Sequence, residues 1–265
     1  MSTAAPRHCG TAALQTPATI QFYMPTVIAA IRSVATYLGI SLYVLLAAPP
    51  GLLVAFLFKK PGVLYDLGHI GVRLGLMLSG IRCDVRGLDR LPRDRAVVFC
   101  ANHQSNVDPP ILFTYLHRRL HVLFKAELLK LPLLGRVFLG GGFIPVRRDN
   151  REQALASIGE GSRSLAAGNT FLIFPEGTRS RTEQLLPFKK GGFIMAIGAQ
   201  APIVPVAIQG GRAAMRKGSR LVWPAQVMVR VGEPIETAGL TMEDRDGLIA
   251  RTREAIQRLL EQGSQ

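Results

Sequence analysis

Apolar and polar positions divide the 265-residue chain into two parts. Residues 33–58 contain no charged side chain, a composition typical of a segment that enters a membrane. Beyond about residue 81, short apolar runs of strand length alternate with segments whose apolar residues recur at helical spacing. The pattern predicts membrane-associated helices over residues 20–80 and an α/β domain over residues 81–265. Residues 1–19 are small and polar, and we expect them to be poorly ordered.

The amino-terminal apolar run is interrupted by a Pro-Pro-Gly sequence at 49–51, which we expect to end a helix. The two halves, Val34–Ala48 and Leu52–Phe58, would then be about 22 Å and about 11 Å long, too short to cross about 30 Å of hydrocarbon. Basic residues lie on both flanks, at Arg32 and Lys59-Lys60. We therefore favour a helical hairpin that dips into one leaflet, with both flanks at one headgroup surface, over a single kinked transmembrane helix. A signal peptide is not expected, because the apolar run starts late and no convincing cleavage site follows it.

A second apolar stretch, Ile70–Ile81, carries only Arg73 and either rests against the membrane or forms the first core helix. The remainder of the chain supplies seven strand-like runs and five helical patterns. The predicted strands are Ile81–Val85, Ala96–Cys100, His121–Phe124, Gly142–Val146, Thr170–Phe174, Pro202–Ile208 and Gln226–Val231. The predicted helices are Pro109–Leu116, Leu128–Leu139, Arg151–Ala167 with Asn150 as its cap, Gly191–Ala199 and Met242–Glu261.

This alternation predicts an α/β fold with a mixed, largely parallel central sheet covered by helices. In open sheets of this kind, ligands gather beyond the carboxyl ends of the strands. The net charge indicates a class of partner: the chain has 32 Lys and Arg against 18 Asp and Glu, a net charge of +14. Because the basic residues are scattered and no nucleic-acid-binding motif is present, we expect a membrane surface as partner and no nucleic acid.

The spacing of cysteines and histidines bears on whether the chain contains disulfides, a cysteine nucleophile or a metal site. Three unevenly spaced cysteines favour reduced thiols in a cytosolic setting over a disulfide framework. Cys100 lies near His103, but its place at the end of an apolar strand favours a small core residue over a nucleophile. No metal site is expected, because the other histidines show no ligand spacing that includes His103.

His103 and Asp108 form a candidate catalytic pair. They follow the predicted strand Ala96–Cys100 in the segment Asn-His-Gln-Ser-Asn-Val-Asp at 102–108. A histidine near neutrality can take up a proton and return it, and a carboxylate on its second ring nitrogen would fix the tautomer. On one α-helix the two side chains would point about 140° apart, so a turn must bring them together. The alternative is a polar loop whose aspartate merely begins the helix before Pro109.

A second cluster, Phe-Pro-Glu-Gly-Thr-Arg-Ser at 174–180, follows the predicted strand Thr170–Phe174. The guanidinium of Arg179 suits phosphate oxygens, and Gly177 would let backbone amides approach an anion. By itself the cluster is also compatible with a turn carrying a surface Glu–Arg pair. Since both clusters lie just beyond the ends of strands, we expect them to share one site.

Together these residues resemble the glycerolipid acyltransferase family typified by 1-acylglycerol-3-phosphate acyltransferase. The family's His-x4-Asp block matches residues 102–108, and its Phe-Pro-Glu-Gly-Thr-Arg-Ser block is intact at 174–180. Two further blocks look like 143–148, ending in Arg147-Arg148, and 201–206. The resemblance implies His103 and Asp108 as catalytic residues. It implies substrate-binding roles for Arg148 (with Arg147 as an alternative), Glu176, Gly177, Thr178, Arg179, Lys125 and Lys189.

The resemblance implies transfer of a fatty acyl group from acyl-CoA or acyl carrier protein to the sn-2 hydroxyl of a lysolipid, with no permanently bound cofactor. His103 would act as general base and Asp108 would hold its imidazole. Arg179, with Arg148 and Lys125 or Lys189, would grip the phosphate, while Glu176 would orient the acceptor's glycerol or an arginine. Backbone amides near Gly177 or the His103 turn would stabilise the oxyanion.

The expected product is phosphatidic acid, made by a protein on the cytoplasmic face of a membrane, the inner membrane of a bacterium. Another acceptor, such as a lyso-ornithine lipid, a non-catalytic membrane-binding protein of the same fold, and a hydrolase remain alternatives.

Overall fold

The computed structural model describes residues 18–92, 94–131, 133–147 and 150–263. Of residues 1–19, predicted to be poorly ordered, only 18 and 19 lie within this part, and they begin the first helix. Arg148 lies outside the described residues, so the structure does not place it.

A seven-stranded sheet runs through the α/β domain in the order β1-β7-β6-β2-β5-β3-β4. Every neighbouring pair is parallel except β6 and β7, which are antiparallel. The predicted mixed, largely parallel sheet is therefore confirmed, and each predicted strand is present to within about two residues at each end. The strands are β1 (Arg82–Arg86), β2 (Val98–Ala101), β3 (Leu120–Lys125), β4 (Ile144–Val146), β5 (Thr170–Ile173), β6 (Ile203–Gln209) and β7 (Gln226–Val231).

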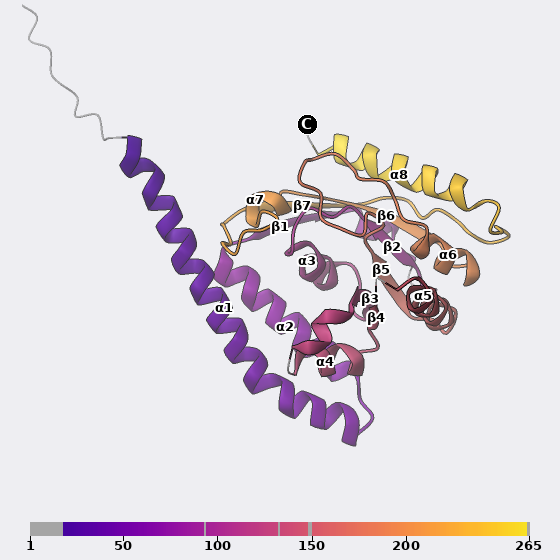
Figure 1. Cartoon of the computed structure of the whole chain (residues 1–265), viewed down its shortest axis with the longest axis horizontal. Coiled ribbons are helices and arrows are strands. Elements are labelled where there is room, and N and C mark those ends of the chain that lie inside the picture. The colour runs from indigo at the N-terminus through magenta and orange to yellow at the C-terminus, as the bar shows by residue number, and fades with distance from the viewer. Residues whose placement is uncertain (1–17, 93, 132, 148–149, 264–265) are drawn as a thin grey trace, which may run out of the picture.

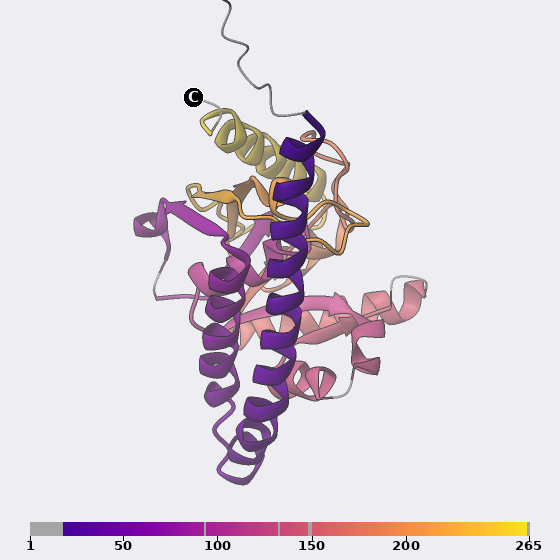
Figure 2. The same ribbon diagram turned by 90° about the vertical axis from the view of Figure 1, so that its left-hand side faces the viewer.

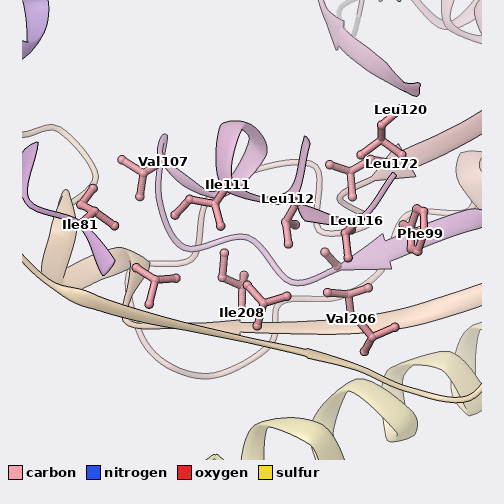
Figure 3. Packing of buried hydrophobic residues seen from close by; sticks show 14 of the residues in the cluster. Ile81, Phe99, Val107, Ile111, Leu112, Leu116, Leu120, Leu172, Val206 and Ile208 are labelled. Atoms are coloured by element: carbon pink, nitrogen blue, oxygen red, sulfur yellow. The ribbon is translucent and has the colours of Figure 1, made fainter. Parts of the chain in front are cut away.

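Helices cover both faces of this sheet (Figure 1). Helix α3 (Asp108–Tyr115) packs on one face, where Ile111 and Leu112 are buried against strand residues such as Phe99 and Ile208 (Figure 3). The opposite face carries α5 (Arg151–Ala166), α6 (Gly191–Gly198) and α8 (Arg245–Glu261). Alternate residues of a strand point to opposite faces, so Phe99 lies in one core and Val98 in the other.

The predicted helices are present except that one of them is divided into two shorter elements. The side chain of Asn150 accepts a hydrogen bond from the amide of Gln153, as expected of a helix cap. The single helix predicted over Leu128–Leu139 is instead a short 3₁₀ turn, η2 (Ala126–Lys130), and α4 (Leu134–Gly140). The reason lies in the backbone: Leu131, which precedes a proline, is extended, and Leu133 has a φ of 64°. Two short elements complete the set, η1 (Leu88–Arg90) and α7 (Gly211–Ala214).

Two long helices, α1 (Ala18–Leu57) and α2 (Gly62–Ser79), lie side by side as a hairpin against the domain (Figures 1 and 2). The expectation that the Pro-Pro-Gly sequence ends the first helix is wrong, because α1 continues through it. Its small residues Ala48, Gly51 and Ala55 are buried, and a β-carbon on Gly51 would collide with Leu67 of α2. Close packing of the two helices thus outweighs the unfavourable helix propensity of the prolines.

The continuity of α1 also moves the bend of the hairpin. The chain reverses around Lys59 and Lys60, about 40 Å along the helix from Arg32 at about 1.5 Å per residue. The observed hairpin is therefore formed by α1 and α2, and not by two short halves on either side of the Pro-Pro-Gly sequence. Residues Thr26–Leu57 of α1 are long and apolar enough to cross a membrane by length and composition.

Candidate active site

His103 lies in the turn that joins β2 to α3, beyond the carboxyl end of β2, and Asp108 is the first residue of α3. The turn brings His103 Nδ1 to 3.0 Å from Asp108 Oδ2. The same oxygen accepts the backbone amides of Gln104 and Ser105, both at 2.6 Å. The Asp108 side chain is fully buried, whereas 16% of the His103 side chain is exposed. With Nδ1–H directed at the carboxylate, Nε2 is the ring nitrogen left to exchange protons.

Packing fixes both partners of this pair. The His103 ring stacks on Phe174, with centroids 4.2 Å apart and an interplanar angle of 29°. The second carboxylate oxygen of Asp108, Oδ1, is buried and has no hydrogen-bond partner among the described residues. Gly211 lies directly against it, and a β-carbon at that position would overlap Oδ1. Glycine is therefore required at 211 to leave room for the carboxylate.

Glu176 joins the two sequence clusters into one unit. Its Oε1 accepts the amide of His103 at 2.8 Å, and its Oε2 accepts the amide of Leu186 at 2.9 Å. The amide of Ser180 in turn donates to the carbonyl of His103 at 2.8 Å. Only 3% of Glu176 is exposed, so the structure places it beneath the turn, with both oxygens engaged, rather than facing a substrate. Burial raises the pKa of Glu176, and the two amide donors oppose that shift.

Some of the remaining predicted residues line the cavity next to His103, and Lys189 lies outside this lining. Lys125, Thr178 and Arg179 line the same cavity as His103. Lys125 also pairs with the exposed Glu127, Nζ to Oε1, at 2.9 Å. Lys189 is exposed and crosses Gly177, where a β-carbon would lie 2.7 Å from its side chain.

Four backbone amides of the two loops have acceptors inside the protein. The amide of Gly177 donates to the carbonyl of Phe174 at 3.0 Å, in a residue whose φ is 67°. The amides of His103, Gln104 and Ser105 all donate to carboxylates. These four amides already have internal acceptors, so the expectation that backbone amides near Gly177 or the His103 turn stabilise an oxyanion stays a prediction for the neighbouring amides of the two loops.

A cavity of about 940 Å³ lies between the helical hairpin and the α/β domain and reaches His103. Most of its lining is apolar and comes from α1, α2, α3, β3 and α4, including Ile40, Leu64, Phe113, Phe124 and Phe138. Its volume falls at the upper end of the 300–1,000 Å³ typical of ligand sites, which bury apolar ligands and orient them with a few polar groups. The arrangement suits a long apolar chain whose polar end meets His103 and Arg179.

Two other features bear on the chemistry. Cys100 is fully buried, and burial raises the pKa of its thiol, so the expectation of a core residue is confirmed. Within the described ranges, no three His, Cys, Asp or Glu side chains are grouped so that they could hold a metal ion.

Sequence reasoning missed the segment that follows β6. Gly211 shapes the pocket of Asp108, Met215 lines the cavity, and Lys217 contacts the loop of Arg179. A signal was available: a Gly-Gly pair at 210–211 and a basic pair at 216–217 follow the carboxyl end of a buried strand.

The fold and site define an α/β protein with a His–Asp pair that faces an apolar cavity under a helical hairpin. The sequence model of the family described as Acyltransferase matches residues 82–209. A 1-acyl-sn-glycerol-3-phosphate acyltransferase of Limnanthes douglasii is 32% identical over 217 residues, 79% of this chain and 76% of that protein. The chain belongs to this acyltransferase family.

Other relatives carry the same name. One from Cocos nucifera is 35% identical, covering 67% of this chain and 57% of that protein. The alpha form of Homo sapiens is 34% identical, covering 68% of this chain and 64% of that protein. The chain thus spans less than two thirds of the length of these two relatives. The crystal structure of 1-acyl-sn-glycerophosphate acyltransferase, PlsC, from Thermotoga maritima shares the fold, with a TM-score of 0.80 at 24% identity over 91% of this chain and 98% of that one.

The position of Glu176 leads to a prediction. In Glu176→Gln one oxygen becomes an NH₂ group that faces an amide donor, so we expect kcat to fall by roughly 10-fold or more as the His103 turn loosens. Because the pKa of Glu176 is raised in the folded state, its ionisation opposes folding as pH rises. The stability of the wild type relative to the Gln variant should therefore decrease as pH rises through that pKa.

Melting curves of both proteins over a pH series, with kcat measured alongside, check this prediction. A difference in stability that grows with rising pH, or an unchanged kcat, would contradict it.

Proposed function

We propose that the protein transfers a fatty acyl group from a thioester to the sn-2 hydroxyl of 1-acylglycerol-3-phosphate, which gives phosphatidic acid. The observation that carries the proposal is the His103–Asp108 pair, with Nδ1 engaged and the ring at an apolar cavity that also contains Arg179. The names of the relatives support the same acceptor.

The proposed chemistry is direct attack on the thioester. His103 Nε2 takes the proton of the acceptor hydroxyl while its oxygen forms a bond to the thioester carbonyl carbon. Asp108 stabilises the imidazolium that results. The tetrahedral intermediate then collapses, the carbon–sulfur bond breaks, and the imidazolium returns the proton to the departing thiolate. Buried Cys100 is no candidate for an acyl-enzyme, and the hydroxyl of Ser105 is engaged by the carbonyl of Met215 at 2.7 Å.

The apolar cavity and the basic side chains bind different parts of the substrate in this proposal. The acyl chain occupies the cavity under the hairpin, and the acceptor phosphate meets Arg179, with Lys125 close to the same opening. Lys189 and Arg148 or Arg147 complete the cationic surface in this proposal. The donor is acyl-CoA or acyl carrier protein, used as a co-substrate with no bound cofactor. Glu176 acts as a positioning residue, since both of its oxygens hold the backbone.

The apolar hairpin supports attachment to a membrane surface. Large side chains along one stripe of α1 are more than half exposed, among them Leu38, Leu42, Leu45, Leu53 and Phe56. The helix also touches the domain at both ends of this stretch: Ser33 bonds Val222, and Phe56 lies beside Gly140 of α4. These contacts are separated by 23 residues, about 35 Å, so a spanning α1 would draw the domain into hydrocarbon. We therefore favour a hairpin that lies in the interface of one leaflet, on the cytoplasmic face.

The first test is turnover. Purified wild type should form phosphatidic acid from 1-acylglycerol-3-phosphate and acyl-CoA or acyl carrier protein, and His103→Ala should lose on the order of 10²–10⁴ in kcat while remaining folded.

A panel of acceptors separates the alternatives. Preference for a lyso-ornithine lipid would change the acceptor, free fatty acid released without an acceptor would indicate a hydrolase, and no thioester-dependent product would favour a non-catalytic protein. A folded His103→Ala variant with full turnover would refute the role of the base.

The second test is membrane binding. Leu38→Asp with Leu42→Asp should reduce flotation with anionic lipid vesicles, because two charges enter the apolar stripe. Leu155→Asp with Met242→Asp is a matched control, since both side chains are exposed and neither belongs to the hairpin. Equal flotation of the two double variants would show that the α1 stripe does not carry the attachment.

A further inference from the structure

The segment between β6 and β7 contacts all three parts of the proposed site. At its start, Gly211 lies against the carboxylate of Asp108, and the carbonyl of Met215 accepts the hydroxyl of Ser105 at 2.7 Å. The middle of the segment reaches the loop that carries Arg179, and its end reaches the membrane-facing helix α1. A segment with contacts of this kind is positioned to set the distances between these parts.

Lys217 makes the central contact. Its Nζ donates to the carbonyl oxygen of Arg179 at 2.8 Å and to Thr178 Oγ1 at 3.1 Å. Both acceptors belong to residues that line the cavity. Bonds from a charged donor to two consecutive residues hold that short stretch of backbone in one conformation. The guanidinium of Arg179 therefore starts from a fixed backbone position.

The charge of Lys217 has no acidic partner within the described residues, because none of the ion pairs there includes it. Its two acceptors are a carbonyl and a hydroxyl, which leave the positive charge uncompensated. The ammonium of Lys217 and the guanidinium of Arg179 together favour an anion at the cavity.

The far end of the segment is anchored on α1. The amide of Val222 donates to Ser33 Oγ at 2.8 Å, and Ser33 is 3% exposed. Tyr37 also donates its hydroxyl to the carbonyl of Arg220 at 2.8 Å. Lys217 therefore projects from a stretch that is held at both ends, so its ammonium cannot easily follow a displaced Arg179 loop.

We propose that Lys217 is a positioning residue for the phosphate-bearing headgroup: it fixes the Thr178–Arg179 loop so that Arg179 meets the acceptor phosphate. This inference rests on the proposed function and adds to it a residue outside the blocks that carry the family resemblance. It predicts a defect in recognition of the phosphate rather than in the proton transfers at His103.

The test compares Lys217→Met with wild type as full-length proteins in detergent. We expect KM for 1-acylglycerol-3-phosphate to rise roughly 10-fold or more, as for the loss of a charged hydrogen bond, while kcat stays within about threefold. The Kd of glycerol 3-phosphate, a headgroup probe without an acyl chain, should rise in parallel. Lys217→Arg, which keeps the charge, should recover part of the loss, and Arg179→Ala gives the scale of a lost phosphate contact.

Arg216→Met is the matched control, because Arg216 is exposed and adjacent, and its loss changes the net charge equally. Unchanged KM and Kd in Lys217→Met would overturn the proposal. So would a loss confined to kcat, or an equal rise of KM in Arg216→Met. Melting temperatures near that of wild type confirm that the variants fold.

The binding measurement separates this inference from the proposed function. A wild type without acyl transfer that still binds glycerol 3-phosphate more tightly than Lys217→Met would refute the reaction and keep the role of Lys217. A wild type that transfers acyl groups with Lys217→Met indistinguishable from it would refute the role of Lys217 alone.

Discussion

One carboxylate oxygen organises the candidate active site. Asp108 Oδ2 receives three N–H groups, from the His103 ring and from the amides of Gln104 and Ser105. Because the amides belong to the turn that carries the histidine, the same oxygen shapes the turn and orients the imidazole. A fully buried carboxylate needs such partners to be tolerated. The geometry on which the proposed proton exchange at Nε2 depends is therefore part of the folded structure itself.

The sheet and the hairpin place this turn where a lipid could reach it. The parallel strands β2 and β5 are neighbours and end side by side. His103 follows β2 and Phe174 follows β5, so their rings are close enough to stack. Residues of the hairpin line one side of the apolar cavity that reaches His103. The exposed outer side of the same helices presents leucine and phenylalanine to the surroundings. The apolar hairpin thus contributes to the lining of the cavity and to the surface proposed to meet the membrane.

Sequence reasoning predicted what depends on local pattern. The strands, the Asn150 cap and the closeness of His103 to Asp108 follow from apolar periodicity, capping chemistry and the need for a turn. It was wrong where tertiary packing decides: α1 runs through Pro49 and Pro50 because Gly51 lets α2 approach closely. It also could not show that Glu176 accepts the amide of His103, 73 residues away, or that Lys217 contacts Thr178 and Arg179, 39 and 38 residues away, because such distant partners leave no local pattern.

The most direct test of the central claim is kcat of Asp108→Asn, measured at saturating acceptor and donor. The amide oxygen of asparagine can still accept from the turn, so the variant should fold, but it carries no charge to stabilise the imidazolium. A loss on the order of 10³–10⁴, with far-UV circular dichroism unchanged, is the expected result. A folded variant that retains kcat within about tenfold of wild type would contradict the account, because the charge of Asp108 would then be dispensable.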